Sequence, residues 1–190
     1  MKTKLFSLLF SAFLAIGGWA QDDSKYGSTP EAVEECKKNL SLYREYRDQN
    51  LPDQAMPFWR AAFEICPKSA KTLYIDGAKF YGDILDGIYE DSSKIDERNA
   101  YIDTLMLIYD KRIENFNEEG KVLTYKANDL YKYDESRAKE ANEMFKRSME
   151  LMGMETDAIA ASKYYQTLYG LYRAGEAEKS DLLVEYMPVL

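Results

Sequence analysis

The 190-residue chain contains no histidine. This absence excludes Ser-His-Asp and Cys-His nucleophile activation, histidine-ligated zinc and the commonest general base. The sequence also lacks the glycine-rich phosphate and dinucleotide motifs, the nucleophile elbow and the calcium-binding loop. Its many carboxylates are interspersed with Lys and Arg, as on solvated helix faces. We therefore expect no enzyme, no catalytic residue, no cofactor and no metal site. An enzyme that uses carboxylates alone is kept as a third alternative.

Long apolar runs are also absent, apart from one near the start of the chain. Lys2 and Lys4 precede the almost wholly apolar stretch 5–16, and small residues ending at Ala20 stand before Gln21. This arrangement is typical of a secretory signal peptide over residues 1–20, cleaved between Ala20 and Gln21. A transmembrane anchor is the alternative, but the run is shorter than the roughly 20 residues that span a bilayer. We expect an exported protein that does not insert into the membrane after cleavage.

The chain has little positive charge relative to negative charge. Its formal net charge is −8, and removal of the two signal-peptide lysines would leave −10. Such an acidic protein repels nucleic acid and anionic membrane surfaces, so neither is expected as a partner. Residues 21–28 are polar and patternless and predict a flexible lead-in. The length that remains, residues 29–190, suits a single domain.

Apolar residues recur at three- and four-residue steps over residues 29–190, and no stretch keeps the alternation of a strand. The sequence therefore predicts an all-α fold. We expect Ser28, at capping-box spacing from Glu31, and Asp53 to cap the first two helices. A loop is expected over residues 86–94. The expected helices form four antiparallel hairpins and cover residues 28–48, 53–66, 69–85, 95–116, 118–131, 136–152, 156–174 and 176–186.

The first hairpin carries most of a helical-repeat pattern. In that pattern a helix-turn-helix of about 34 residues has W-x2-L-G-x2-Y, then A-x3-F, then a closing proline. Six residues stand at matching positions: Leu42, Tyr46, Ala55, Trp59, Ala62 and Pro67. Asn39 and Tyr43 replace the tryptophan and the glycine of the pattern. The small Ala55 would let the two helices approach closely, and the large Trp59 would fill the angle between them.

The pattern weakens after the first hairpin. The positions that remain are Ala141, Phe145 and Ser148 in the third hairpin and Leu168 and Tyr172 in the last. The chain resembles the tetratricopeptide-repeat (TPR) family and is similar to exported TPR proteins of Bacteroidota. That resemblance implies a right-handed α-solenoid of about four antiparallel hairpins over residues 29–190. It also implies the periplasm or the inner face of the outer membrane as the location. A generic helical bundle is the alternative fold.

The two cysteines lie fifteen residues on either side of Leu51, at the centre of the first predicted turn. Residues equally far from the turn of an antiparallel hairpin sit at the same height, and both cysteines fall on facing apolar stripes. We therefore predict a structural disulfide between Cys36 and Cys66, as expected for an exported chain. Two buried, reduced cysteines are the alternative. A redox-catalytic pair is not expected, because there is no C-x-x-C.

A TPR-type concave surface implies a non-catalytic scaffold or adaptor that holds a protein partner of the cell envelope. The candidate partner-binding residues are three cations of the first helix: Lys37, Arg44 and Arg47. They would bind an acidic segment or a C-terminal carboxylate, unless they form an ordinary solvated face. The 16 tyrosines either pack in the core or line a groove. The alternative function is therefore an envelope module that binds carbohydrate or a small ligand through exposed tyrosines.

The last residues, 182–190, are strongly apolar to the end of the sequence. Solenoids normally finish with a polar outer face. Three explanations stay open: the last hairpin packs inward, it docks on another chain, or the repeat array continues beyond the given sequence. Self-association through this apolar helix is one expected consequence.

Overall fold

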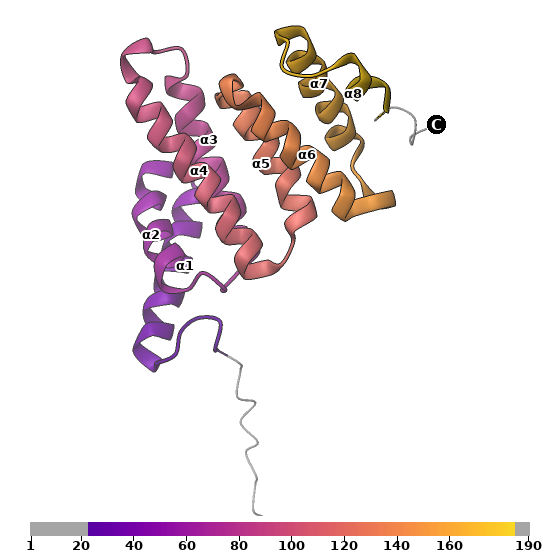
Figure 1. Ribbon diagram of the computed structural model, residues 1–190. Helices are drawn as coiled ribbons and strands as arrows, with labels where there is room; N and C mark the ends of the chain where they lie inside the picture. The colour runs from indigo at the N-terminus through magenta and orange to yellow at the C-terminus, as the bar shows by residue number, and fades with distance from the viewer. Residues whose placement is uncertain (1–22, 185–190) are drawn as a thin grey trace, which may run out of the picture.

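The computed structural model describes residues 23–184 as a helical array (Figure 1). No strand occurs in this range, so the prediction of an all-α fold is confirmed. Three short 3-10 helices connect some of the α-helices. The α-helices are α1 (Pro30–Asp48), α2 (Pro52–Ile65), α3 (Lys71–Ile88), α4 (Ile95–Phe116), α5 (Glu119–Tyr133), α6 (Ala138–Met152), α7 (Ala158–Ala174) and α8 (Lys179–Val184).

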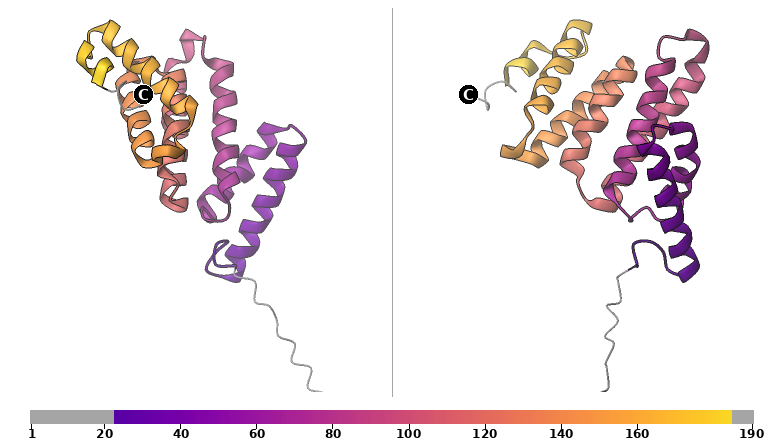
Figure 2. Two further views of the ribbon diagram at one scale, coloured as in Figure 1. Left: turned by 90° about the vertical axis from the view of Figure 1, so that its right-hand side faces the viewer. Right: turned by 180° about the vertical axis from the view of Figure 1, so that it is seen from behind.

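The helices pair into successive antiparallel hairpins that lie side by side in chain order (Figure 1). The views from the side and from behind keep the same order, from α1–α2 to α7–α8 (Figure 2). Helix α2 also packs against α3, α4 against α5, and α6 against α7, so each hairpin is joined to the next. No helix within residues 23–184 is long and apolar enough to cross a membrane. The predicted signal peptide, its cleavage site at Ala20 and Gln21, and residues 185–190 lie outside the described range.

The first two helix starts differ from the prediction. Thr29, not Ser28, caps α1, and its hydroxyl accepts a hydrogen bond from the Ala32 amide at 3.2 Å. Helix α2 begins at Pro52, so Asp53 lies inside its first turn and is not the cap. In both helices a proline occupies the first turn, where its missing N–H costs nothing and its fixed φ suits a helix.

The loop predicted over residues 86–94 is mostly helical. Helix α3 continues to Ile88, and a 3-10 helix occupies Ser92–Lys94. Its cap is Asp91, whose carboxylate accepts from the Ser93 amide at 3.0 Å. The extension of α3 beyond residue 85 is stabilised by Tyr89, just past the end of the helix. Its ring packs against that of Tyr133, with centroids 6.2 Å apart. Tertiary contacts thus outweigh the polar composition of the segment.

Helix α4 has the predicted bounds, and the remaining helix boundaries differ from the prediction by at most three residues. Asp134 caps a 3-10 helix at Glu135–Arg137, which precedes α6 where the prediction began a continuous helix at Ser136. Asp157 caps α7, and its carboxylate accepts from the Ile159 amide at 2.8 Å.

The first hairpin is crosslinked by a disulfide between Cys36 and Cys66, with a Cα–Cα distance of 5.9 Å. Both cysteines are buried in the core between α1 and α2. The pairing predicted from the symmetry of the hairpin is therefore present. Within residues 23–184 no free cysteine remains.

Tyrosine side chains are divided between the core and the surface. Exposed rings occur at only three described positions, Tyr125, Tyr169 and Tyr172. Those with less than a tenth of their surface exposed are Tyr43, Tyr74, Tyr81, Tyr109, Tyr133 and Tyr164. Six more are partly buried against the core: Tyr26, Tyr46, Tyr89, Tyr101, Tyr131 and Tyr165. Core packing thus accounts for most described tyrosines, and one exposed ring, that of Tyr125, lies in a groove.

Candidate functional site

A groove of about 510 Å³ lies between α3 and α5, with α4 contributing to its lining. We call it the α3–α5 groove. Its two walls run in the same direction. Lys71 Nζ lies 2.8 Å from Glu118 Oε1 at the N-terminal ends, and the Tyr133 hydroxyl donates to Asp86 Oδ1 at 2.9 Å near the C-terminal ends. The lining residues are Ile75, Ala78, Lys79, Gly82, Asp83 and Asp86 of α3, Tyr109 and Arg112 of α4, and Lys121, Tyr125, Asp129 and Tyr133 of α5.

Small residues on α3 leave room for the groove. Ala78 and Gly82 stand one helical turn apart and face α5. A methyl group added at Gly82 would lie 3.4 Å from the Tyr133 hydroxyl, which donates to the Gly82 carbonyl at 3.2 Å. The opposite wall presents Tyr125, which is 44% exposed. A side chain from a bound molecule would therefore meet an accessible aromatic ring.

The N-terminal end of the groove is positively charged. Arg112 is 6% exposed, and its Nη2 lies 3.1 Å from Glu118 Oε2. Its Nε is buried and has no hydrogen-bond partner among the described residues. Lys71 and then Arg112 hold the pKa of Glu118 below its usual range, because one carboxylate serves both cations. Lys121 adds an exposed ammonium group without a polar partner in the described part of the chain.

The other end of the groove is negatively charged. Asp83, Asp86 and Asp129 line it. The Tyr109 hydroxyl donates to Asp129 Oδ2 at 2.6 Å. Burial raises the pKa of Asp129 in spite of this hydrogen bond, and burial together with the Asp129 charge raises the pKa of Tyr109. The pKa of Asp86 shifts in the opposite direction, because a hydrogen bond from Lys132 lowers it.

The groove presents several groups that could contact a bound molecule. It has an exposed ring, a positive end and a negative end, with a partly buried Tyr109–Asp129 hydrogen bond between α4 and α5. No group of three potential metal ligands occurs among residues 23–184. The groove lining contains no histidine, cysteine or serine that could act as an activated nucleophile.

The predicted partner-binding cations lie elsewhere, on α1. Lys37 Nζ pairs with Asp23 Oδ2 at 2.8 Å, and Arg47 is held between Asp76 and Asp48. Arg44 lies over the Tyr43 ring, 5.7 Å from its centroid. Two of the three predicted cations are therefore already paired with carboxylates. Their role in binding a partner stays a prediction.

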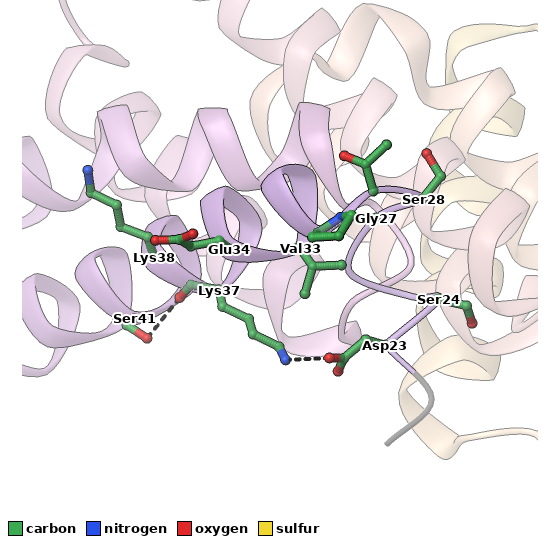
Figure 3. Close-up of a pocket in the computed structure, with 11 residues that line it drawn as sticks. Asp23, Ser24, Gly27, Ser28, Val33, Glu34, Lys37, Lys38 and Ser41 are labelled. Carbon is green, nitrogen blue, oxygen red and sulfur yellow. Dashed lines mark hydrogen bonds and ion pairs between the residues drawn. The ribbon is translucent and has the colours of Figure 1, made fainter. Parts of the chain in front are cut away.

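Lys37 belongs to a second hollow, of about 790 Å³, where the lead-in packs beside α1. Figure 3 shows its ammonium group pointing to Asp23, while Lys38 points away. The lining is formed largely by the exposed start of α1, with Val33 as its main apolar member (Figure 3). This hollow ends at the limit of the described residues, so the α3–α5 groove is the stronger candidate.

The residues that match the repeat pattern act in packing. Ala55 and Ala62 are fully buried. Trp59 Nε1 donates to the Leu73 carbonyl at 2.7 Å, which joins α2 to α3. Tyr46 stacks on Phe58 with ring centroids 5.7 Å apart. The other two also contribute: Leu42 is partly buried, and the Pro67 carbonyl accepts from the Tyr74 hydroxyl at 2.9 Å.

Comparison with protein-family models, with curated proteins and with solved structures found no match to this chain. The resemblance to the TPR family and to proteins of Bacteroidota therefore stays a prediction. The groove itself was not predicted from the sequence. One available signal was the series Lys121, Tyr125, Asp129 and Tyr133, which repeats at four-residue steps and places polar and aromatic groups on one face of α5.

Proposed function

We propose that this chain is a non-catalytic scaffold or adaptor that holds a protein partner in the α3–α5 groove. The observation that carries the proposal is the groove, with an exposed aromatic ring between ends of opposite charge. Aromatic side chains are enriched at the centres of protein interfaces, and polar groups form the rim around them. A TPR-like right-handed solenoid would place the groove on its concave side, between the first helices of two successive hairpins.

The same proposal includes export to the periplasm or to the outer membrane. The Cys36–Cys66 disulfide supports an oxidising compartment, because such bonds persist mainly outside the cytosol. The apolar segment 5–16 supports the same conclusion from the sequence.

Carbohydrate is the alternative ligand, since the Tyr125 ring stands near carboxylates that could accept sugar hydroxyls. The rings of Tyr109 and Tyr133 also line the groove, but both are buried. Sugars usually stack on an open aromatic face, and here only Tyr125 offers one. A protein segment therefore fits the groove better.

Site-specific photo-crosslinking in cells tests the proposal. Tyr125 is replaced by benzoylphenylalanine, and Lys139, exposed on α6 away from the groove, is replaced in the matched control. We expect a protein adduct from position 125 that is absent from position 139. The plug variant Ala78→Trp, combined with the probe at 125, should lose that adduct. Equal adducts from both positions, or only glycan captured at position 125, would overturn the proposal.

A further inference from the structure

The α3–α5 groove separates its charges along its length. Lys71 meets Glu118 where α3 and α5 start, and Tyr133 meets Asp86 where they end. These contacts fix the register of the two walls. Lys121 and Arg112 therefore lie toward the N-terminal end, and Asp83 and Asp86 lie toward the other end. Tyr125 stands between them.

At the positive end there are more cations than counter-charges. Glu118 accepts from both Lys71 and Arg112, at 2.8 and 3.1 Å. Lys121 has no described polar partner, and Arg112 Nε is buried without an acceptor. Arg112 and Lys121 both line the groove, and Glu118 alone offsets the cations here, so a carboxylate from a ligand would be stabilised at this end.

At the negative end there are more carboxylates than cations. Lys79 pairs with Asp83 at 2.6 Å, and Lys132 pairs with Asp86 at 2.7 Å. Asp129 receives hydrogen bonds only from neutral groups, the Tyr109 hydroxyl at 2.6 Å and the Asn128 amide at 3.3 Å. An ammonium or guanidinium group from a ligand would find uncompensated negative charge here.

The two ends are separated by a length that a short peptide can match. Lys121 and Asp129 are eight residues apart on one helix, which corresponds to about 12 Å. An extended peptide advances about 3.3 Å per residue, so it covers this length in three or four residues. A residue in the middle of the segment would then lie over Tyr125.

Resting on the proposed function, we propose that the groove selects an extended peptide segment whose acidic and basic side chains stand three or four residues apart. The acidic group binds at Arg112 and Lys121, and the basic group binds at Asp83 and Asp129. Opposite charges at the two ends also fix the direction in which the segment lies, since reversing it would place like charges together.

A panel of fluorescein-labelled nonapeptides tests this inference on the purified chain. Each peptide is blocked at both ends and carries one Lys and one Glu, in either order. The two charged residues stand one to seven positions apart. Peptides with two Lys or two Glu serve as charge controls. Fluorescence anisotropy at low salt should show tightest binding at separations of three and four, in one order of the two charges. The variant Lys121→Glu should weaken that binding about tenfold or more, whereas the matched surface change Lys139→Glu should not.

A charge-exchange variant gives the sharpest result. In Lys121→Glu combined with Asp83→Lys, both exposed, the N-terminal end of the groove becomes neutral and the other end becomes positive, so the preferred peptide order should reverse. Thermal unfolding followed by circular dichroism verifies that each variant is folded. Binding that ignores spacing, order or these variants, or no binding by any peptide, would overturn the inference. If the photo-adduct at position 125 persists in that case, the scaffold proposal stands, and only the inference that the groove selects a peptide by its charges fails.

Discussion

The first and the last hairpins have the same topology but are held by different contacts. In the first, a disulfide joins α1 to α2, and the Trp59 ring lies against Gly77 of α3. In the last, α7 is tied to α6 by the buried amide of Asn142, which donates to the Tyr164 carbonyl at 2.9 Å and to the Thr167 hydroxyl at 2.8 Å.

The two hairpins also differ in the kind of side chain that they expose. Helix α7 exposes large apolar side chains, including Ile159 at 60% and Tyr169 at 54%, whereas α1 exposes mainly charged groups. Elements with less buried apolar surface open at lower free energy than the core. We therefore expect unfolding to start at α7–α8, with the first hairpin opening last.

Removal of the disulfide should have the largest effect on this difference. The Cys36→Ser and Cys66→Ser double variant frees a loop of about 30 residues in the unfolded chain, and the chain-entropy model predicts a loss of about 3–4 kcal/mol. Denaturant unfolding measures this loss. Hydrogen exchange should then show α1–α2 opening as early as α7. A reduced wild-type chain is the control and should be as stable as the variant. Unchanged stability of the variant would contradict a stabilising role of the disulfide.

A matched pair of glycine substitutions comes next. At Gly77 an added methyl carbon would lie 2.2 Å from Trp59 Cζ2, so Gly77→Ala should cost about 2–3 kcal/mol by overpacking. At Gly170 of α7 the nearest atom is 3.9 Å away, and Ala favours a helix over Gly by up to about 1 kcal/mol. Thermal melts should thus move in opposite directions. Equal shifts would show that the two ends are packed alike.

Asn142→Ala should destabilise the last hairpin by about 1–3 kcal/mol, because the Tyr164 carbonyl and the Thr167 hydroxyl lose a buried donor. Native-state hydrogen exchange should accelerate in α7 and leave α1 and α2 unchanged. The exposed Ser162→Ala on the same helix is the control. Faster exchange throughout the chain would mean that the hairpins unfold as one unit.

The smallest expected effect is on pH dependence, at the joint between the second and third hairpins. The folded-state pKa of Glu118 is lowered by Lys71 and Arg112. Its stabilisation is therefore complete above the unfolded pKa, about 4.3, and is lost as the pH falls through the lower folded value. The loss should be below about 1 kcal/mol, since the pair is partly exposed.

The free energy of unfolding is measured as the pH is lowered, for wild type and for Glu118→Gln. The difference between the two curves gives the contribution of Glu118. The variant should lack the loss below pH about 4. The Asn142 link between α6 and α7 contains no titratable group, so exchange in α7 should not respond. If exchange in α7 changed with pH as much as exchange in α3, the two contacts between hairpins would not be independent.

The sequence predicted local features well, because they depend on neighbouring residues. Helix α4 has the predicted bounds of residues 95–116, and the cysteine pair follows from the position of one turn. Errors occurred where distant contacts decide the outcome. The extension of α3 to Ile88 is supported by Tyr133, which lies 45 positions further along the chain. The pairing of Lys37 with Asp23 and of Arg47 with Asp76 was likewise not predicted, because the fold brings these residues together, and the binding role of the two cations stays a prediction.

Periodicity, turn residues and cysteine spacing by themselves determined an all-helical chain of hairpins with a crosslinked first pair. Helical periodicity and a tight turn act over a few residues, so they are visible in one dimension. Only the tertiary structure decided that α3 and α5 run side by side, with Ala78 and Gly82 leaving room opposite Tyr125. The charges at each end of that groove come from helices far apart in sequence, and no local pattern could show them together.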